Sequence, residues 1–243
     1  MSTARRGLPK SSNARPEPAP VRLADLARCR QAAYRLLGEA LRPPEPERLV
    51  TLRRVAEELR ERPGPLAELA FFPHWLDLLR RLLQSTDGET GRLDETYVRL
   101  FVASPEGICP QQASHYLAPG APAAVIADLE REYAAAGLVV SADATEPPDH
   151  VGVTLDFMAH LCAEEAGAWR RRAHAKARAQ LDLQARFLGR YLRPWLPGFA
   201  RLVASRDGDG FYARISETAA TLAAHDLDLV KVLAARVGEE EAR

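Results

Sequence analysis

The residues of this chain best suited to bind a metal are its six histidines and three cysteines, Cys29, Cys109 and Cys162. Asp156 and His160 lie one helical turn apart and Cys162 follows closely, so this stretch could supply a pair of ligands. One pair is a weak indication, and a packed cysteine beside a surface Asp–His pair explains the same pattern. The cysteines are too few and too widely spaced for a disulfide framework or a cysteine-type zinc site. We therefore predict no metal site.

Known catalytic motifs are absent from the sequence as well. A Walker-type phosphate loop needs glycine directly before its lysine, and none of Lys10, Lys176 and Lys231 follows a glycine. The chain also has no Gly-x-Ser-x-Gly, His-Glu-x-x-His or Glu-x-x-His motif. The sequence predicts neither an enzyme nor a cofactor.

The elements that position any site are predicted to be helices. The chain of 243 residues is 47% hydrophobic and 27% charged, and it contains 42 Ala and 33 Leu against 14 Val and 3 Ile. This composition predicts an all-α, single-domain bundle of about nine or ten helices. The formal net charge is zero, which argues against general nucleic-acid binding.

Apolar spacing and Pro/Gly punctuation divide the chain into helical segments. The domain is predicted to cover residues 21–237, and residues 1–20 and 238–243 are predicted to be tails, the first disordered because it is rich in proline and poor in hydrophobic residues. The predicted segments are 21–41, 45–62, 75–84, 93–102, 121–136, 149–169, 169–195, 198–205 and 211–237.

No segment resembles a membrane span or an export signal. The longest stretch without formal charge, residues 107–127, contains several prolines, and Arg5-Arg6 is not followed by an apolar run. We therefore predict a cytoplasmic protein. The long connection 103–120 contains Ile108, Tyr116 and Leu117, and we expect it to pack against the core.

Charge is segregated along the second half of the chain. Residues 128–165 contain nine acids and one base, and residues 166–201 contain nine bases and one acid. The simpler interpretation is that neighbouring helices neutralise each other or that the charged side chains face water. The alternative is an acidic groove that binds a basic peptide.

The segment Glu-Pro-Pro-Asp-His at residues 146–150 combines a proline-fixed extended entry with a helix start. Asp149 is a suitable N-cap, and Val151, Leu155 and Met158 begin an apolar face. The sequence pattern indicates no structural role for His150. We expect it to be neutral at the helix N-terminus and to make a binding or interdomain contact.

This segment, within EPPDHVGVTLDFMAHLC at residues 146–162, resembles the hallmark of the TorD/DmsD/NarJ family of redox-enzyme maturation chaperones. The resemblance covers roughly residues 21–233. Flanking pieces agree in the same order: YVRLFV (97–102), the proline loop with Pro110, Ser114 and Tyr116, DLEREYAAAGL (128–138) and LDLQARFLGRYLRPWLPGF (181–199).

The resemblance implies a chaperone that binds the N-terminal leader, often a twin-arginine signal, of the catalytic subunit of a molybdenum-cofactor oxidoreductase. It would hold that subunit in the cytoplasm until cofactor insertion is complete, acting as a monomer or a domain-swapped dimer. The expected peptide-binding residues are Glu146, Pro147, Pro148, Asp149, His150, Asp156, Tyr97, Phe101, Ser114 and Tyr116.

Two other classes stay open. Guanine nucleotide binding has been attached to some members of the family, although no phosphate-binding motif is present here. The chain could also be a helical scaffold with an unrelated partner. Identification of the partner separates these classes.

Overall fold

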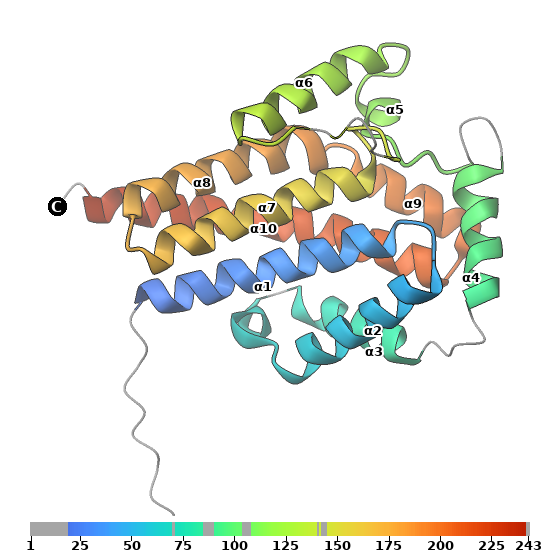
Figure 1. Ribbon diagram of the computed structural model, residues 1–243, viewed down its shortest axis with the longest axis horizontal. Coiled ribbons are helices and arrows are strands. Elements are labelled where there is room, and N and C mark those ends of the chain that lie inside the picture. The colour runs from blue at the N-terminus through green and yellow to red at the C-terminus, as the bar shows by residue number, and fades with distance from the viewer. Residues whose placement is uncertain are drawn as a thin grey trace, which may run out of the picture.

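The computed structural model describes residues 19–69, 71–84, 90–103, 108–139, 141 and 145–241. This part of the chain is helical, which confirms the predicted all-α class (Figure 1). The elements are α1 (Ala19–Ala40), α2 (Pro46–Glu61), the 3-10 turn η1 (Gly64–Glu68), α3 (Phe72–Gln84), α4 (Thr90–Tyr97), the π-helix η3 (Val98–Val102), α5 (Ala113–Leu117), α6 (Pro122–Ala135), α7 (Val151–Arg170), α8 (His174–Phe187), the π-helix η4 (Leu188–Leu192), α9 (Leu196–Asp207) and α10 (Phe211–Glu241).

The first and last helices have ends that differ from the predicted segments. Helix α1 begins at Ala19, and most of the predicted tail 1–20 lies outside the described residues. Helix α10 continues to Glu241, past the predicted end of the domain at residue 237. The short elements η1 and α5 were not predicted, because one or two turns carry too little apolar periodicity to be recognised.

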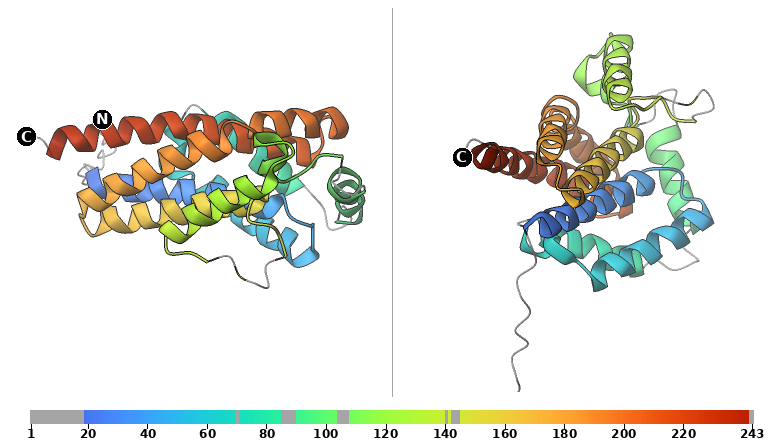
Figure 2. Two further views of the ribbon diagram at one scale, coloured as in Figure 1. Left: turned by 90° about the horizontal axis from the view of Figure 1, so that it is seen from above. Right: turned by 60° about the vertical axis from the view of Figure 1, so that its left-hand side comes forward.

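Helices α1, α7, α8 and α10 form the centre of the molecule and run alternately in opposite directions (Figures 1 and 2). The apolar face predicted for α7 is confirmed, since Val151, Leu155, Met158 and Cys162 are fully buried. Helices α2 and α3 cover one side of this bundle, and α5 and α6 form an arm on the opposite side.

Helices α1 and α7 approach each other closely at two glycines, Gly38 and Gly152. A Cβ atom added to Gly152 would lie 3.2 Å from the Gly38 carbonyl oxygen, and one added to Gly38 would lie 3.2 Å from the Gly152 carbonyl oxygen. Absence of side chains at both positions lets the two backbones come together. This crossing places the start of α7 beside the end of α1.

The long connection predicted over residues 103–120 packs only in part. Tyr116 and Leu117 contact the core from α5, and Cys109 is fully buried. Ile108, in contrast, is 40% exposed.

Candidate functional site

The turn at residues 146–150 leads directly into α7, and His150 rather than Asp149 is the N-cap. The imidazole Nδ1 of His150 accepts a hydrogen bond from the backbone N–H of Gly152 at 3.1 Å. His150 therefore satisfies a backbone donor that would otherwise be unpaired in the first turn of the helix. The sequence-based assignment of the cap to Asp149 is wrong by one residue.

Asp149 instead caps a different helix. Its carboxylate Oδ2 accepts a hydrogen bond from the backbone N–H of Ser114, in the first turn of α5, at 3.1 Å. Its backbone carbonyl accepts from Ala113 at 2.8 Å, and Gln112 and His150 form an antiparallel bridge. The turn thus ties the α5–α6 arm to the start of α7.

The second imidazole nitrogen of His150 lies 3.2 Å from Oε1 of Gln111. Because Nδ1 is an acceptor, Nε2 carries the proton and donates to this oxygen. The Tyr97 hydroxyl donates to the same oxygen at 3.1 Å, and the Gln111 side-chain amide donates to the Leu41 carbonyl at 2.7 Å. Burial, together with the positive charge of Arg42, lowers the pKa of His150 to about 4. The imidazole is therefore neutral at pH 7, as its position at a helix start suggested.

At the surface of this site, three carboxylates converge on the guanidinium group of Arg42. Asp156 lies 2.6 Å from it, Glu39 3.0 Å and Glu146 3.3 Å. The Arg42 side chain is only 10% exposed, whereas the side chains of Glu39, Glu146 and Asp156 are 36%, 25% and 39% exposed. Burial raises the pKa of Asp156, although Arg42 partly offsets this. The cluster therefore presents an excess of carboxylate groups to solvent, which attracts cations.

Three of the aromatic and loop residues expected to bind a peptide lie in a packed aromatic cluster. Tyr97 and Phe101 are buried, with ring centroids 5.0 Å apart. The ring of Tyr116 stacks on Trp195 at 5.3 Å, and its hydroxyl donates to the Pro110 carbonyl at 2.9 Å. Peptide contact by Tyr97 and Phe101 would require this cluster to open.

The predicted site residues thus fall into two groups. At the surface, fully or in part, are Glu146, Pro147, Pro148, Asp156 and Tyr116. Buried beneath them are Asp149, His150, Ser114, Tyr97 and Phe101. The buried group can shape the surface group through hydrogen bonds and packing.

Ion pairs join the two oppositely charged segments, 128–165 and 166–201. Asp128 on α6 pairs with Arg190 at 2.6 Å, and Glu132 pairs with Arg186 at 2.7 Å. These contacts favour the simpler interpretation of the charge pattern. These two acids of α6 therefore do not support an acidic groove, because both already pair with arginines.

A second polar cluster lies in the core, and sequence reasoning missed it. Arg30 on α1 is fully buried and contacts Asp226 on α10 at 2.5 Å and Glu165 on α7 at 2.7 Å. It also donates to the side-chain oxygen of Gln184 on α8. One guanidinium group therefore joins all four central helices.

Two aromatic residues complete this buried cluster. The Tyr34 hydroxyl donates to Asp226 at 2.8 Å, and the Trp169 indole N–H donates to Glu165 at 3.0 Å. Each charged group in the cluster thus has several hydrogen-bond partners, which is what keeps a buried ion pair tolerable.

The three possible metal ligands, Asp156, His160 and Cys162, each make a different contact. Asp156 pairs with Arg42, the His160 ring stacks on Phe157, and Cys162 is buried beside Gln184. Within the described residues, no group of three His, Cys, Asp or Glu side chains could hold a metal ion. In the same part of the chain, no helix is long and apolar enough to cross a membrane.

The fold resembles that of a known structure. The crystal structure of a putative redox enzyme maturation protein from Archaeoglobus fulgidus superimposes with a TM-score of 0.50 over 79% of this chain and 91% of the other, at 19% sequence identity. This likeness supports the fold as a whole.

Sequence comparison defines the family. Residues 55–201 match the model of the nitrate reductase delta subunit family, so the chain belongs to this family, which includes the TorD/NarJ chaperones. This is a family of chaperones for redox-enzyme maturation rather than of enzymes.

Individual relatives agree with this assignment. The chain is 30% identical over 150 residues to the chaperone protein TorD of Vibrio cholerae serotype O1, covering 60% of this chain and 65% of TorD. It is 38% identical over 85 residues to a selenate reductase assembly chaperone protein of Thauera selenatis, covering 34% of this chain and 42% of that protein. The matches therefore span less than two thirds of either relative.

Proposed function

We propose that this chain is a cytoplasmic maturation chaperone that binds the N-terminal leader of the catalytic subunit of a molybdenum-cofactor oxidoreductase. It retains the subunit until cofactor insertion is complete and then releases it for assembly or export. Membership of the chaperone family supports the general role, and a relative described as a selenate reductase assembly chaperone supports a reductase as the partner.

The carboxylates around Arg42 are the observation that carries the leader-binding part of the proposal. A twin-arginine leader brings two cations. Here three partly exposed carboxylates share a single, largely buried arginine, Arg42. Cations from the leader can therefore pair with carboxylate oxygens that face solvent.

The expected affinity is moderate. A leader that buries ~600 Å² of apolar surface gains roughly 15 kcal/mol at ~25 cal/mol/Å². Association and ordering costs remove much of this, leaving about 8 kcal/mol, which corresponds to micromolar binding. Binding in this range permits release of the mature subunit.

Affinity capture tests the identity of the partner. The tagged protein, produced in its native host, is expected to retain the catalytic subunit of a molybdenum-cofactor oxidoreductase. A synthetic peptide with that subunit's leader sequence is expected to displace it. Capture of only proteins unrelated to redox enzymes would instead identify a scaffold.

We expect the double variant Glu146→Gln/Asp156→Asn to bind a twin-arginine peptide about tenfold more weakly, because two solvent-facing negative charges are lost. Isothermal titration calorimetry measures this change, and thermal denaturation checks the fold. Glu164→Gln is the matched control, since Glu164 is exposed on the same helix, α7, but outside the Arg42 cluster. Equal affinities for all three proteins would exclude the Arg42 cluster as the cation site.

A further inference from the structure

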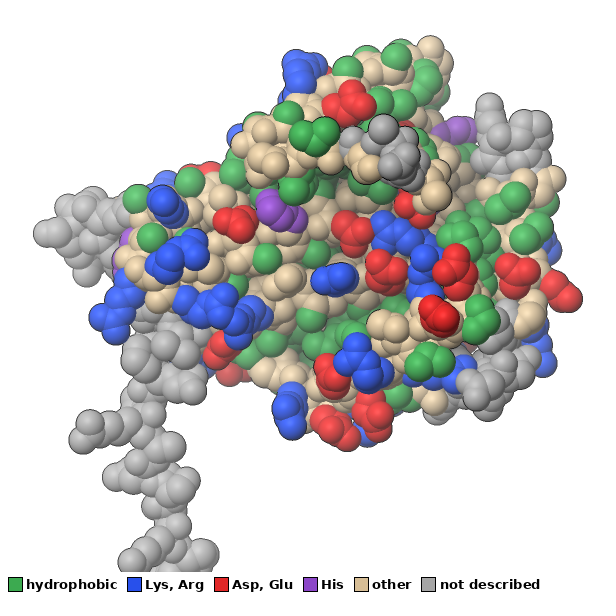
Figure 3. Space-filling view, viewed as in Figure 1, with side chains coloured by type: hydrophobic (Ala, Val, Ile, Leu, Met, Phe, Trp, Pro, Cys, Tyr) green, Lys and Arg blue, Asp and Glu red, His purple; other side chains and the backbone are tan. Residues whose placement is uncertain are grey.

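A groove of about 690 Å³ runs between α1 and α2. Its apolar lining consists of Ala32 and Leu36 from α1 and Leu52 and Val55 from α2. Apolar side chains are visible between charged ones over these two helices in Figure 3. The groove therefore combines an apolar floor with charged walls, as expected of a site for an extended or helical amphipathic segment.

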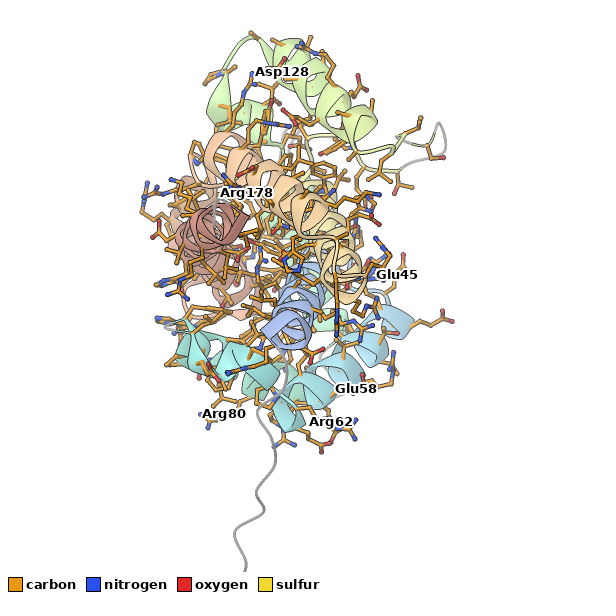
Figure 4. All side chains as sticks on the ribbon, turned by 90° about the vertical axis from the view of Figure 1, so that its left-hand side faces the viewer. Glu45, Glu58, Arg62, Arg80, Asp128 and Arg178 are labelled. Atoms are coloured by element: carbon orange, nitrogen blue, oxygen red, sulfur yellow. The ribbon has the colours of Figure 1, made fainter. Side chains whose placement is uncertain are left out.

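The two ends of the groove carry different charges. Helices α1 and α2 are antiparallel and joined by a short turn, so the end of α1 lies beside the start of α2. At this turn end the lining includes Glu39, Glu45 and Glu47 with a single base, Arg48. Figure 4 shows Glu45 at the start of α2 and Glu58 further along the helix.

The opposite end of the groove is basic. Arg28 lines it from α1 and Arg54 lines it from α2, whereas Arg35 lies one helical turn before Glu39, between the two ends. Arg54 is joined to Glu58 at 2.8 Å. Within the described part of the chain, the salt bridges of the groove walls involve Arg42, Arg48 and Arg54 but not Arg28.

The acidic end is continuous with the Arg42 cluster. Glu39 contacts Arg42 at 3.0 Å on one side and Arg48 at 3.2 Å on the other. The carboxylates of Glu146 and Asp156 therefore extend the negative end of the groove across to α7.

We infer that this groove holds the apolar stretch of the leader, with the basic pair of the leader at the turn end, so that the leader runs antiparallel to α1. The inference rests on the proposed function and adds where the leader binds and in which direction it runs. In a leader, the positive charges precede the apolar run. Only the stated direction places these charges against Glu39, Glu45 and Glu47, because the reverse direction places them against Arg28 and Arg54.

Photo-crosslinking tests the direction with a synthetic probe. The probe is a peptide in which Arg-Arg is followed by an apolar stretch of about twelve Leu and Ala residues. One version carries a photoreactive phenylalanine before the arginines, and a second carries it at the C-terminal end. Mass spectrometry is expected to find the first attached near Glu45–Glu47 and the second near Arg28 and Val55.

A pair of variants tests the binding site itself. Val55→Glu places a charge in the apolar floor and is expected to weaken binding of the probe by about tenfold or more. Val50→Glu is the control, because Val50 lies on the same helix, is 61% exposed and does not line the groove. Thr51→Trp, at an exposed lining position, obstructs the groove without a charge and serves if Val55→Glu does not fold.

The outcomes separate this inference from the proposed function. Interchanged crosslinks would overturn the direction, and crosslinks elsewhere, or equal effects of Val55→Glu and Val50→Glu, would overturn the binding site. In these cases the probe still binds and the proposed function stands. Failure of the probe to bind at all would overturn the groove inference, while affinity capture of the reductase subunit decides the proposed function.

Discussion

Replacement of Arg30 by methionine is expected to lower the free energy of unfolding by about 3–5 kcal/mol. The substitution keeps an apolar stem of similar length but leaves Asp226 and Glu165 buried without their cation. Two buried carboxylates that lose their shared partner cost much more than an ordinary surface change. Urea denaturation followed by circular dichroism measures the difference.

Arg28→Met is the matched control for this experiment, since Arg28 is exposed on the same helix. We expect its effect to stay within about 0.5 kcal/mol. The triple variant Arg30→Met/Glu165→Gln/Asp226→Asn should recover part of the loss, because the stranded charges are removed as well. A loss below about 1 kcal/mol for Arg30→Met would show that the core cluster contributes little.

Acidification is expected to destabilise the protein through His150. The pKa of this imidazole is lowered from 6.5 to about 4 by burial and by the charge of Arg42. The unfolded chain therefore takes up a proton at a higher pH than the folded chain does. The contribution of His150 is fully present above pH 6.5 and is lost as the pH falls toward 4, by about 2–3 kcal/mol at pH 4.5 relative to pH 7.5.

His150→Asn isolates this effect. Asparagine is a good N-cap but does not titrate, so the variant keeps a capping group at the start of α7. At pH 7.5 it is expected to be less stable by about 1 kcal/mol, because the hydrogen bond to Gln111 is lost. Denaturation at both pH values should show a smaller acid loss for the variant than for the wild type. Identical losses would mean that His150 is not the group responsible.

The fold could be predicted largely from the sequence because its helices are long and are separated by proline and glycine residues. The segments predicted over 45–62 and 121–136 correspond to α2 and α6 with ends shifted by one residue. The cap of α7 could not be predicted in this way. Asp149 and His150 are both plausible caps locally. The choice depends on α5, because the backbone N–H of Ser114 donates a hydrogen bond to the Asp149 carboxylate.

The core cluster illustrates a different difficulty. Arg30 is one of many arginines in the chain, and its burial follows from tertiary contacts with three other helices. One indication was present in the spacing. Arg30 shares a helical face with Ala27, Tyr34 and Leu37, all of which are buried. An arginine in the middle of an apolar stripe is a candidate for a buried ion pair.

The surface site was predicted in part for a similar reason. Glu146 and Asp156 could be identified from the turn and the helix that follows it, but their partner Arg42 comes from the connection after α1, more than a hundred residues away. No local pattern links these positions. The groove beside them depends in the same way on how α1 and α2 pack.

The close contact between Gly38 and Gly152 also has a mechanical consequence. From this contact to its first residue, Ala19, helix α1 extends about 28 Å at 1.5 Å per residue. If the two helices pivot at the glycines, a rotation of about 5° displaces the far end of α1 by roughly 2.5 Å. Glu39 and Arg42 lie within a turn of the pivot and hardly move. In such a rotation the carboxylate cluster would keep its geometry while the distant end of α1 moves.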